Sequence, residues 1–97
     1  MIICAAIKID QEDKEPIIVA GLSHGDCYEI LYKLNPELSA RARLKGLITD
    51  GFITSINTFV DRREAYFIAK QCGQLSSQAL HDKTMRKEFE LYSEDLY

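Results

Sequence analysis

The sequence predicts an α+β fold, a ββα-ββα arrangement with an antiparallel sheet, two main helices and a C-terminal tail. Two observations support this: there are two pairs of strand-like segments, and each pair precedes a segment with helical apolar periodicity. The chain has 97 residues, which is enough for one hydrophobic core. We expect a single domain over residues 1–97, with a core over 1–73 and a tail over 74–97.

The first strand pair opens the chain. Residues 1–9 are β-branched and apolar on both faces, so this strand should lie centrally in the sheet. The charged segment 10–15 predicts a turn. Residues 16–20 predict a second strand, with Pro16 at its entrance, where a missing N–H does least harm.

A helix is predicted over about residues 26–34. Its apolar side chains recur at the i, i+3, i+4, i+7 spacing of a buried helical face: Cys27, Ile30, Leu31 and Leu34. Asp26 is the expected N-cap. Asn35 should end the helix, because the residue before a proline avoids the helical region. Residues 37–45 could form a second short helix.

The second strand pair is predicted at residues 52–54 and 58–60, joined by a turn at 55–57. Asp61 then begins the best-defined helix, because it is an N-cap residue with Glu64 three positions later. Gly73 is the expected C-terminal stop. The predicted buried face consists of Ala65, Ile68, Ala69 and Cys72.

The remaining residues predict a less regular tail. Ser76 or Ser77 could cap a weak helix that runs to about Glu88. Residues 88–97 combine acidic side chains with large apolar ones. A free terminus does not usually carry such apolar content, so we expect the tail to pack on the body of the domain or on a neighbouring subunit.

The composition narrows the functional classes. The formal net charge of −3 argues against general affinity for nucleic acid, although basic residues at 41–45 and 62–63 leave room for a pocket that binds an anion. The apolar run at residues 2–7 is too short for a signal peptide or a membrane span. We expect a cytoplasmic protein with no membrane partner and no stable nucleic-acid binding.

The three cysteines lack metal-binding or disulfide spacing, and each falls in an apolar pattern. We therefore expect Cys4, Cys27 and Cys72 to be buried. The chain also lacks a P-loop, GxGxxG, HExxH or GxSxG motif. We expect no metal and no cofactor, and a protein that is not an enzyme.

Residues 23–27 form the first candidate site, at a strand-to-helix turn. His24 could act as a base for a Cys27 nucleophile. Alternatively, Asp26 caps the helix and Cys27 is buried, or His24 and the loop amides touch a phosphate or ribose.

The second candidate is the pair Arg62 and Arg63, which lies unfavourably at a helix N-terminus. Either arginine could bind phosphate, or could be solvated or paired with the acidic tail. Aromatic residues could stack on a base, although core packing accounts for most of them. Tyr66 and Phe67 are adjacent, so one of them should be exposed.

Four segments together resemble a family of short phage- and prophage-encoded proteins. These segments are ICAAIKI, GLSHGDCYEIL, GFITSINTFVDRREAYFIAKQCGQL and the terminal SEDLY. The family pattern has Arg, Gln and Arg where this chain has Ser23, Asp50 and Thr58. A ligand that touches those positions would differ, or would bind with a different affinity.

The resemblance implies a function. Such small phage proteins are linked to sponge proteins that antagonise Thoeris-type bacterial defence. Sponges sequester nucleotide messengers, such as cyclic ADP-ribose isomers or cyclic oligonucleotides, as homo-oligomers and without cleavage. The implied ligand-binding positions are His24, Asp26, Phe52, Thr54, Phe59, Arg62 and Asp95.

Three hypotheses follow. The first is a homo-oligomeric protein that binds a small nucleotide-like anion in the cytoplasm of an infected or lysogenic host. The second is a protein-interaction module or inhibitor that uses its apolar, acidic tail. The third is a small enzyme that depends on His24 and Cys27. The small size and high apolar content favour an oligomer on physical grounds, because association buries surface that one small domain leaves exposed.

Overall fold

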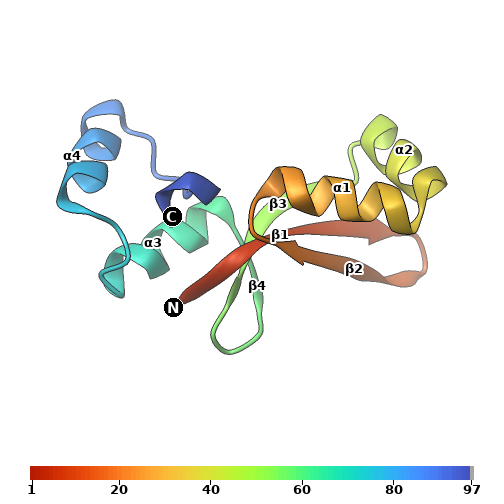
Figure 1. Cartoon of the computed structure of the whole chain (residues 1–97), viewed down its shortest axis with the longest axis horizontal. Helices are drawn as coiled ribbons and strands as arrows, with labels where there is room; N and C mark the ends of the chain where they lie inside the picture. The colour runs from red at the N-terminus through yellow and green to blue at the C-terminus, as the bar shows by residue number, and fades with distance from the viewer. Residues whose placement is uncertain (97) are drawn as a thin grey trace.

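The computed structural model describes residues 1–96, and it confirms the α+β fold (Figure 1). These residues form one four-stranded antiparallel sheet with the strand order β2-β1-β3-β4. Over the same range, the elements are β1 (Ile2–Gln11), β2 (Lys14–Gly21), α1 (His24–Leu34), α2 (Pro36–Lys45), β3 (Ile48–Thr54), β4 (Phe59–Asp61), α3 (Arg62–Gln71), α4 (Ser77–Arg86) and the short 3-10 helix η1 (Ser93–Asp95).

β1 is a central strand, as its two apolar faces predicted, with β2 on one side and β3 on the other. The two hairpins therefore share one sheet. β3 begins at Ile48, four residues before the predicted strand, because Ile48 pairs with Ile9 and extends the ladder along β1. β2 is an edge strand, which explains why it tolerates Pro16 within its length.

α1 begins earlier than predicted. The Ser23 side chain accepts a hydrogen bond from the backbone N–H of Asp26, so Ser23 is the N-cap and Asp26 lies in the first turn. The buried face shifts with the start and runs through His24, Cys27 and Leu31. The predicted burial of Ile30 and Leu34 is wrong, because both lie off this face and are exposed.

α2 forms where a short helix was considered possible, and Asn35 caps its start. α3 has the predicted Asp61 cap, and Gly73 follows it with a left-handed φ of 70°. Tyr66 is buried and Phe67 exposed, as expected of that pair. The predicted burial of Cys72 is wrong: the helix ends at Gln71, and the thiol of the C-cap residue faces solvent.

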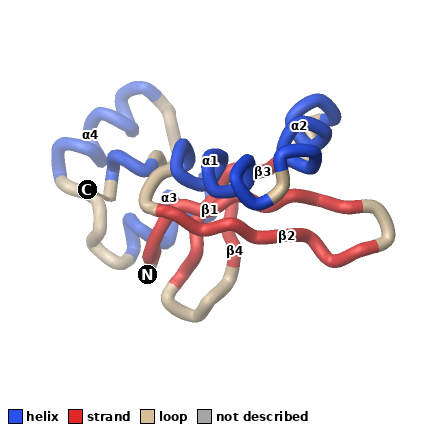
Figure 2. Tube along the Cα trace, turned by 45° about the vertical axis from the view of Figure 1, so that its right-hand side comes forward, coloured by secondary structure: helices blue, strands red, loops and turns tan. Residues whose placement is uncertain are grey.

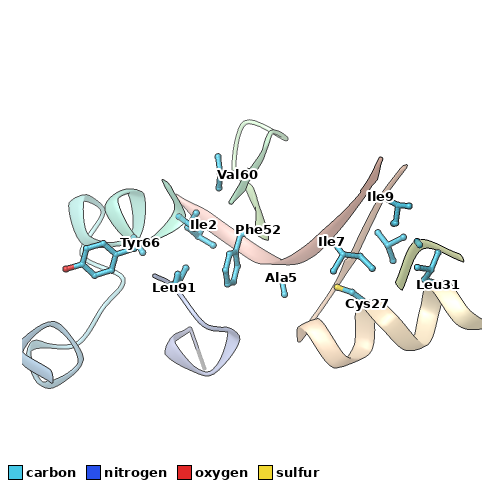
Figure 3. Packing of buried hydrophobic residues seen from close by; sticks show 14 of the residues in the cluster. Ile2, Ala5, Ile7, Ile9, Cys27, Leu31, Phe52, Val60, Tyr66 and Leu91 are labelled. Atoms are coloured by element: carbon cyan, nitrogen blue, oxygen red, sulfur yellow. The ribbon is translucent and has the colours of Figure 1, made fainter. Parts of the chain in front are cut away.

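The tail packs within its own chain. α4 is followed by an extended stretch and by η1, which returns between α3 and the start of α1 (Figure 1). Leu91 is fully buried and joins Ile2, Phe52 and Tyr66 in one part of the core (Figure 3). The other part lies under α1, where Ile7, Ile9, Cys27 and Leu31 meet (Figure 3).

The tube view shows α1 and α2 above the β1–β2 ribbon, with α3, α4 and the C-terminal segment at the opposite end of β1 (Figure 2). Within residues 1–96, no helix has the length and apolar character needed to cross a membrane. The sheet thus supports two helical groups, and the residues that join them lie near the middle of β1.

Candidate functional site

A polar cluster, buried at His24 and Ser93 and half-buried at Asp50 and Arg62, joins the two helical groups, and we name it the His24 cluster. These residues come from α1, β3, α3 and η1. His24 Nε2 lies 2.8 Å from the carbonyl oxygen of Gly51, and His24 Nδ1 lies 2.8 Å from Ser93 Oγ. The backbone N–H of His24 also donates to Ser93 Oγ at 3.3 Å.

These contacts fix the protonation of His24. A carbonyl oxygen only accepts, so Nε2 carries a proton and donates it to Gly51. Nδ1 then accepts, from the Ser93 hydroxyl and, at 3.4 Å, from Arg62 Nη2. Burial lowers the pKa of His24, and the positive charge of Arg62 lowers it further. His24 is therefore a neutral ring with both nitrogens engaged.

Arg62 connects the cluster to the C-terminal segment. Its Nη1 donates to the Leu91 carbonyl at 2.9 Å, and its Nη2 lies 3.2 Å from Asp50 Oδ2. The guanidinium carbon also lies 4.9 Å from the centre of the Tyr92 ring. Arg62 thus holds residues 91 and 92 against the body of the domain, which is why the tail docks in cis.

Asp50 extends the cluster toward α1. Its Oδ1 accepts a hydrogen bond of 2.6 Å from the Tyr28 hydroxyl, while Oδ2 faces Arg62. Burial and the bond to Asp50 raise the pKa of Tyr28 to about 12, so its hydroxyl stays protonated and donates. The Tyr28 ring is consequently fixed at its polar end.

The other side of Tyr28 faces an open groove between α1 and α2, which we name the α1–α2 groove. Its volume is about 690 Å³, within the range of small-molecule sites. The lining residues are Gly25, Tyr28, Glu29, Tyr32, Pro36, Ser39, Ala40 and Arg43. The Arg43 guanidinium carbon lies 4.8 Å from the Tyr28 ring centre. Among residues 1–96, no carboxylate forms an ion pair with Arg43.

Lys83 makes a second polar contact with the tail. Although lysine is rarely buried, its side chain is 7% exposed, 2.9 Å from Asp95 Oδ2 and 2.8 Å from the Glu90 carbonyl. Asp95 also accepts from the backbone N–H of Tyr92, closing the turn of η1. Asp95, which the resemblance implied as a ligand position, is thus paired inside the chain.

The structure brings three of the implied ligand positions together. His24 contacts Arg62, and its ring lies edge-on to Phe52 at 5.0 Å. Phe52 has no exposed surface, so it supports His24 from the core. Asp95 is connected to this group by Tyr92: the Tyr92 backbone N–H donates to Asp95, and the Tyr92 ring lies against Arg62.

The other implied positions lie apart from the cluster. Asp26 is on the exposed side of the first turn of α1. Thr54 is buried and shares a hydrogen bond of 2.7 Å with Thr58 across the β3–β4 hairpin. Phe59 lies on the sheet face that points away from α1, where its ring covers Gly51.

The geometry does not equip His24 and Cys27 as a base and a nucleophile. His24 has no ring nitrogen left to take a proton from a thiol. Burial raises the pKa of Cys27 to about 11, which keeps it as a thiol at neutral pH. Among residues 1–96, no group of three or more histidine, cysteine or acidic side chains could hold a metal ion.

Sequence reasoning noted the basic segment 41–45, which includes Arg43, but missed the tyrosines of the groove. Tyr28 and Tyr32 are one helical turn apart and share a face of α1, which is a readable signal. Their meeting with Arg43 depends on the tight turn at Asn35, and no local pattern shows that the two helices pack this way.

A family model, described as Phage T4 y16D protein, matches residues 1–97. The chain belongs to this phage protein family. The family supports the broad part of the resemblance, a short phage-encoded protein. No curated protein and no solved structure matches the chain.

Proposed function

We propose that this phage protein binds a small nucleotide-like anion in the α1–α2 groove and sequesters it without changing it chemically. One observation carries the proposal: an open hollow combines two tyrosines with an arginine that has no carboxylate partner among residues 1–96. Aromatic faces stack on bases, and a guanidinium binds phosphate oxygens in a bidentate manner. The groove offers both on adjoining walls.

Each wall has a defined part in this binding mode. Tyr32 is 61% exposed, so its ring is free to stack. Tyr28 is held by Asp50 and presents a fixed ring face beside Arg43. Glu29 also lines the groove, but its charge is partly offset by Lys33 at 3.1 Å. A purine-like ring with a phosphate therefore fits the chemistry of this surface.

The His24 cluster acts as the support of the groove in this proposal. Arg62 holds Asp50, and Asp50 holds the Tyr28 hydroxyl, so Arg62 positions a ring that it does not touch. The nearby imidazole and thiol are both engaged or protonated, which favours storage of the ligand over chemistry on it. In the cytoplasm of an infected host, such binding would remove a nucleotide messenger of antiviral immunity, such as a cyclic ADP-ribose isomer or a cyclic oligonucleotide.

Calorimetric titration with a panel of cyclic nucleotides and cyclic ADP-ribose isomers tests the proposal. Arg43→Ala should weaken binding by about tenfold or more, because a charge-assisted pair with phosphate is lost. Arg41→Ala is the matched control: it lies on the same helix, outside the groove, and should change affinity less than about twofold.

Mass spectrometry of ligand released by denaturation separates storage from catalysis. An unchanged ligand supports sequestration, and a chemically altered ligand would contradict it. Failure to bind any member of the panel would reject a nucleotide-like ligand. Equal losses in Arg43→Ala and Arg41→Ala would show that the groove is not the site.

A further inference from the structure

One face of the sheet carries no helix. α1 and α2 cover the side on which Ile7, Ile9 and Val19 lie, and among residues 1–96 no helix covers the opposite side of β1 and β2 (Figure 1). The strand register gives the residues of that uncovered face, which we name the open sheet face: Cys4, Ala6, Lys8, Ile18, Ala20, Thr49, Gly51, Ile53, Phe59 and Asp61.

Much of the open sheet face is apolar. Ile18 is 41% exposed, and Ile53 and Phe59 are half-buried. The Phe59 ring lies close over Gly51, since a Cβ on Gly51 would overlap that ring. An antiparallel sheet that faces water normally alternates apolar residues with polar ones, so an apolar outer face indicates a surface that is covered in the working state.

Two charges of opposite sign lie among these apolar residues, because Lys8 pairs with Ile18 and Asp61 follows Phe59 on β4. The Lys8 ammonium lies 5.6 Å from the centre of the Phe59 ring, and Asp61 neighbours Phe59 on β4 and caps α3. Neither side chain forms an ion pair with another charged group among residues 1–96. The face therefore carries both halves of an ion pair that the described part of the chain does not form.

We infer that the open sheet face binds the same face of a second copy of this chain. A twofold axis in the plane between two stacked sheets, running between Lys8 and Asp61, places each of them opposite the other residue of the partner copy. Two ion pairs then form within the interface, beside Ile18, Ile53 and Phe59 of both copies. The complementary charges therefore favour a second copy of this chain as the partner of the open sheet face.

Sedimentation equilibrium across the micromolar range tests this surface. The wild-type chain should show twice the mass of one chain, and Ile18→Lys should raise the dissociation constant by about tenfold or more, because it places a charge in an apolar interface. Leu44→Lys is the matched control: Leu44 is 88% exposed on α2, away from this face. A monomeric wild type, or equal weakening by both variants, would overturn the inference.

A charge cycle tests the pairing of Lys8 with Asp61 and does not depend on how Ile18→Lys folds. Lys8→Glu should raise the dissociation constant about tenfold, because it sets two carboxylates against each other across the interface. Adding Asp61→Asn should recover part of that loss, since asparagine preserves the helix cap while removing the repulsion. Strictly additive effects of the two substitutions would contradict the arrangement.

Discussion

The His24 cluster and the α1–α2 groove each contain an arginine beside an aromatic ring, but the two regions differ in whether the arginine has a carboxylate partner. In the cluster, Arg62 meets a carboxylate, a carbonyl and an aromatic ring, and both nitrogens of His24 are engaged. In the groove, Arg43 meets a tyrosine ring, with no carboxylate partner among residues 1–96. A satisfied polar group stabilises the fold, whereas an unsatisfied one at an open hollow is available to a ligand.

The largest effect is expected when the His24 side chain is removed from the cluster. His24→Ala should lower the free energy of unfolding by about 3 kcal/mol, because it leaves a cavity and removes a hydrogen-bond partner from the Gly51 carbonyl. His81→Ala is the control on an exposed histidine and should stay within about 0.5 kcal/mol. Urea denaturation gives both values. A loss below about 1 kcal/mol for His24→Ala would show that the cluster is not a structural centre.

One glycine in each region, Gly51 at the cluster and Gly25 at the groove, tests the same difference in packing. Gly51→Ala should cost about 2 kcal/mol, because the added Cβ would overlap the Val60 carbonyl and the Phe59 ring. Gly25→Ala, at the edge of the groove, should be neutral or should stabilise by up to about 1 kcal/mol, since its Cβ meets only Ser23 Oγ at 3.7 Å. Equal thermal shifts in the two variants would contradict the difference in packing.

The pH dependence of stability should reveal the neutral histidine. The pKa of His24 is lowered in the folded state from its ordinary value of 6.5. Below pH 6.5 the histidine of the unfolded chain therefore binds a proton, while the histidine of the folded chain stays neutral until the pH reaches its lower pKa. Stability is therefore fully present above pH 6.5 and falls as the pH drops from there toward the folded pKa. Comparing urea midpoints on the two sides of pH 6.5 checks the sign. His24→Gln should lose this dependence.

The cysteines give the smallest effect and need no substitution. Cys72 is exposed and should react quickly with a thiol reagent in the folded protein. Cys27, buried and with its pKa raised to about 11, should react only on unfolding. Fast labelling of Cys27 without unfolding would show that α1 opens readily.

The sequence predicted much of the fold because its signals were local. The two apolar faces of β1 predicted a central strand, and Asp61 and Gly73 predicted the ends of α3 to within a residue. The start of α1 was misplaced because the buried face begins with a histidine, which apolar periodicity overlooks. Cys72 was expected in the core because the helix was extended one residue too far.

The candidate site was less readable. His24, Phe52 and Arg62 were singled out and do lie together, yet their partners Asp50 and Ser93 were not expected in the cluster. Those partners come from distant segments, and only the sheet register and the return of the tail bring them to His24. Pairings at such separation depend on tertiary packing, which a pattern of neighbouring residues does not encode.

The return of the tail also constrains how the protein is made. Ser93, the partner of His24 on η1, is 69 residues further along the chain. A nascent chain that ends before Leu91 therefore contains His24 without the Ser93 hydroxyl that hydrogen-bonds to it. β1 and β2 can pair while translation continues, whereas the contact of Ser93 with His24 forms only after η1 has been made. Folding should therefore show a late step whose rate responds to Ser93 and Leu91 and not to the first hairpin.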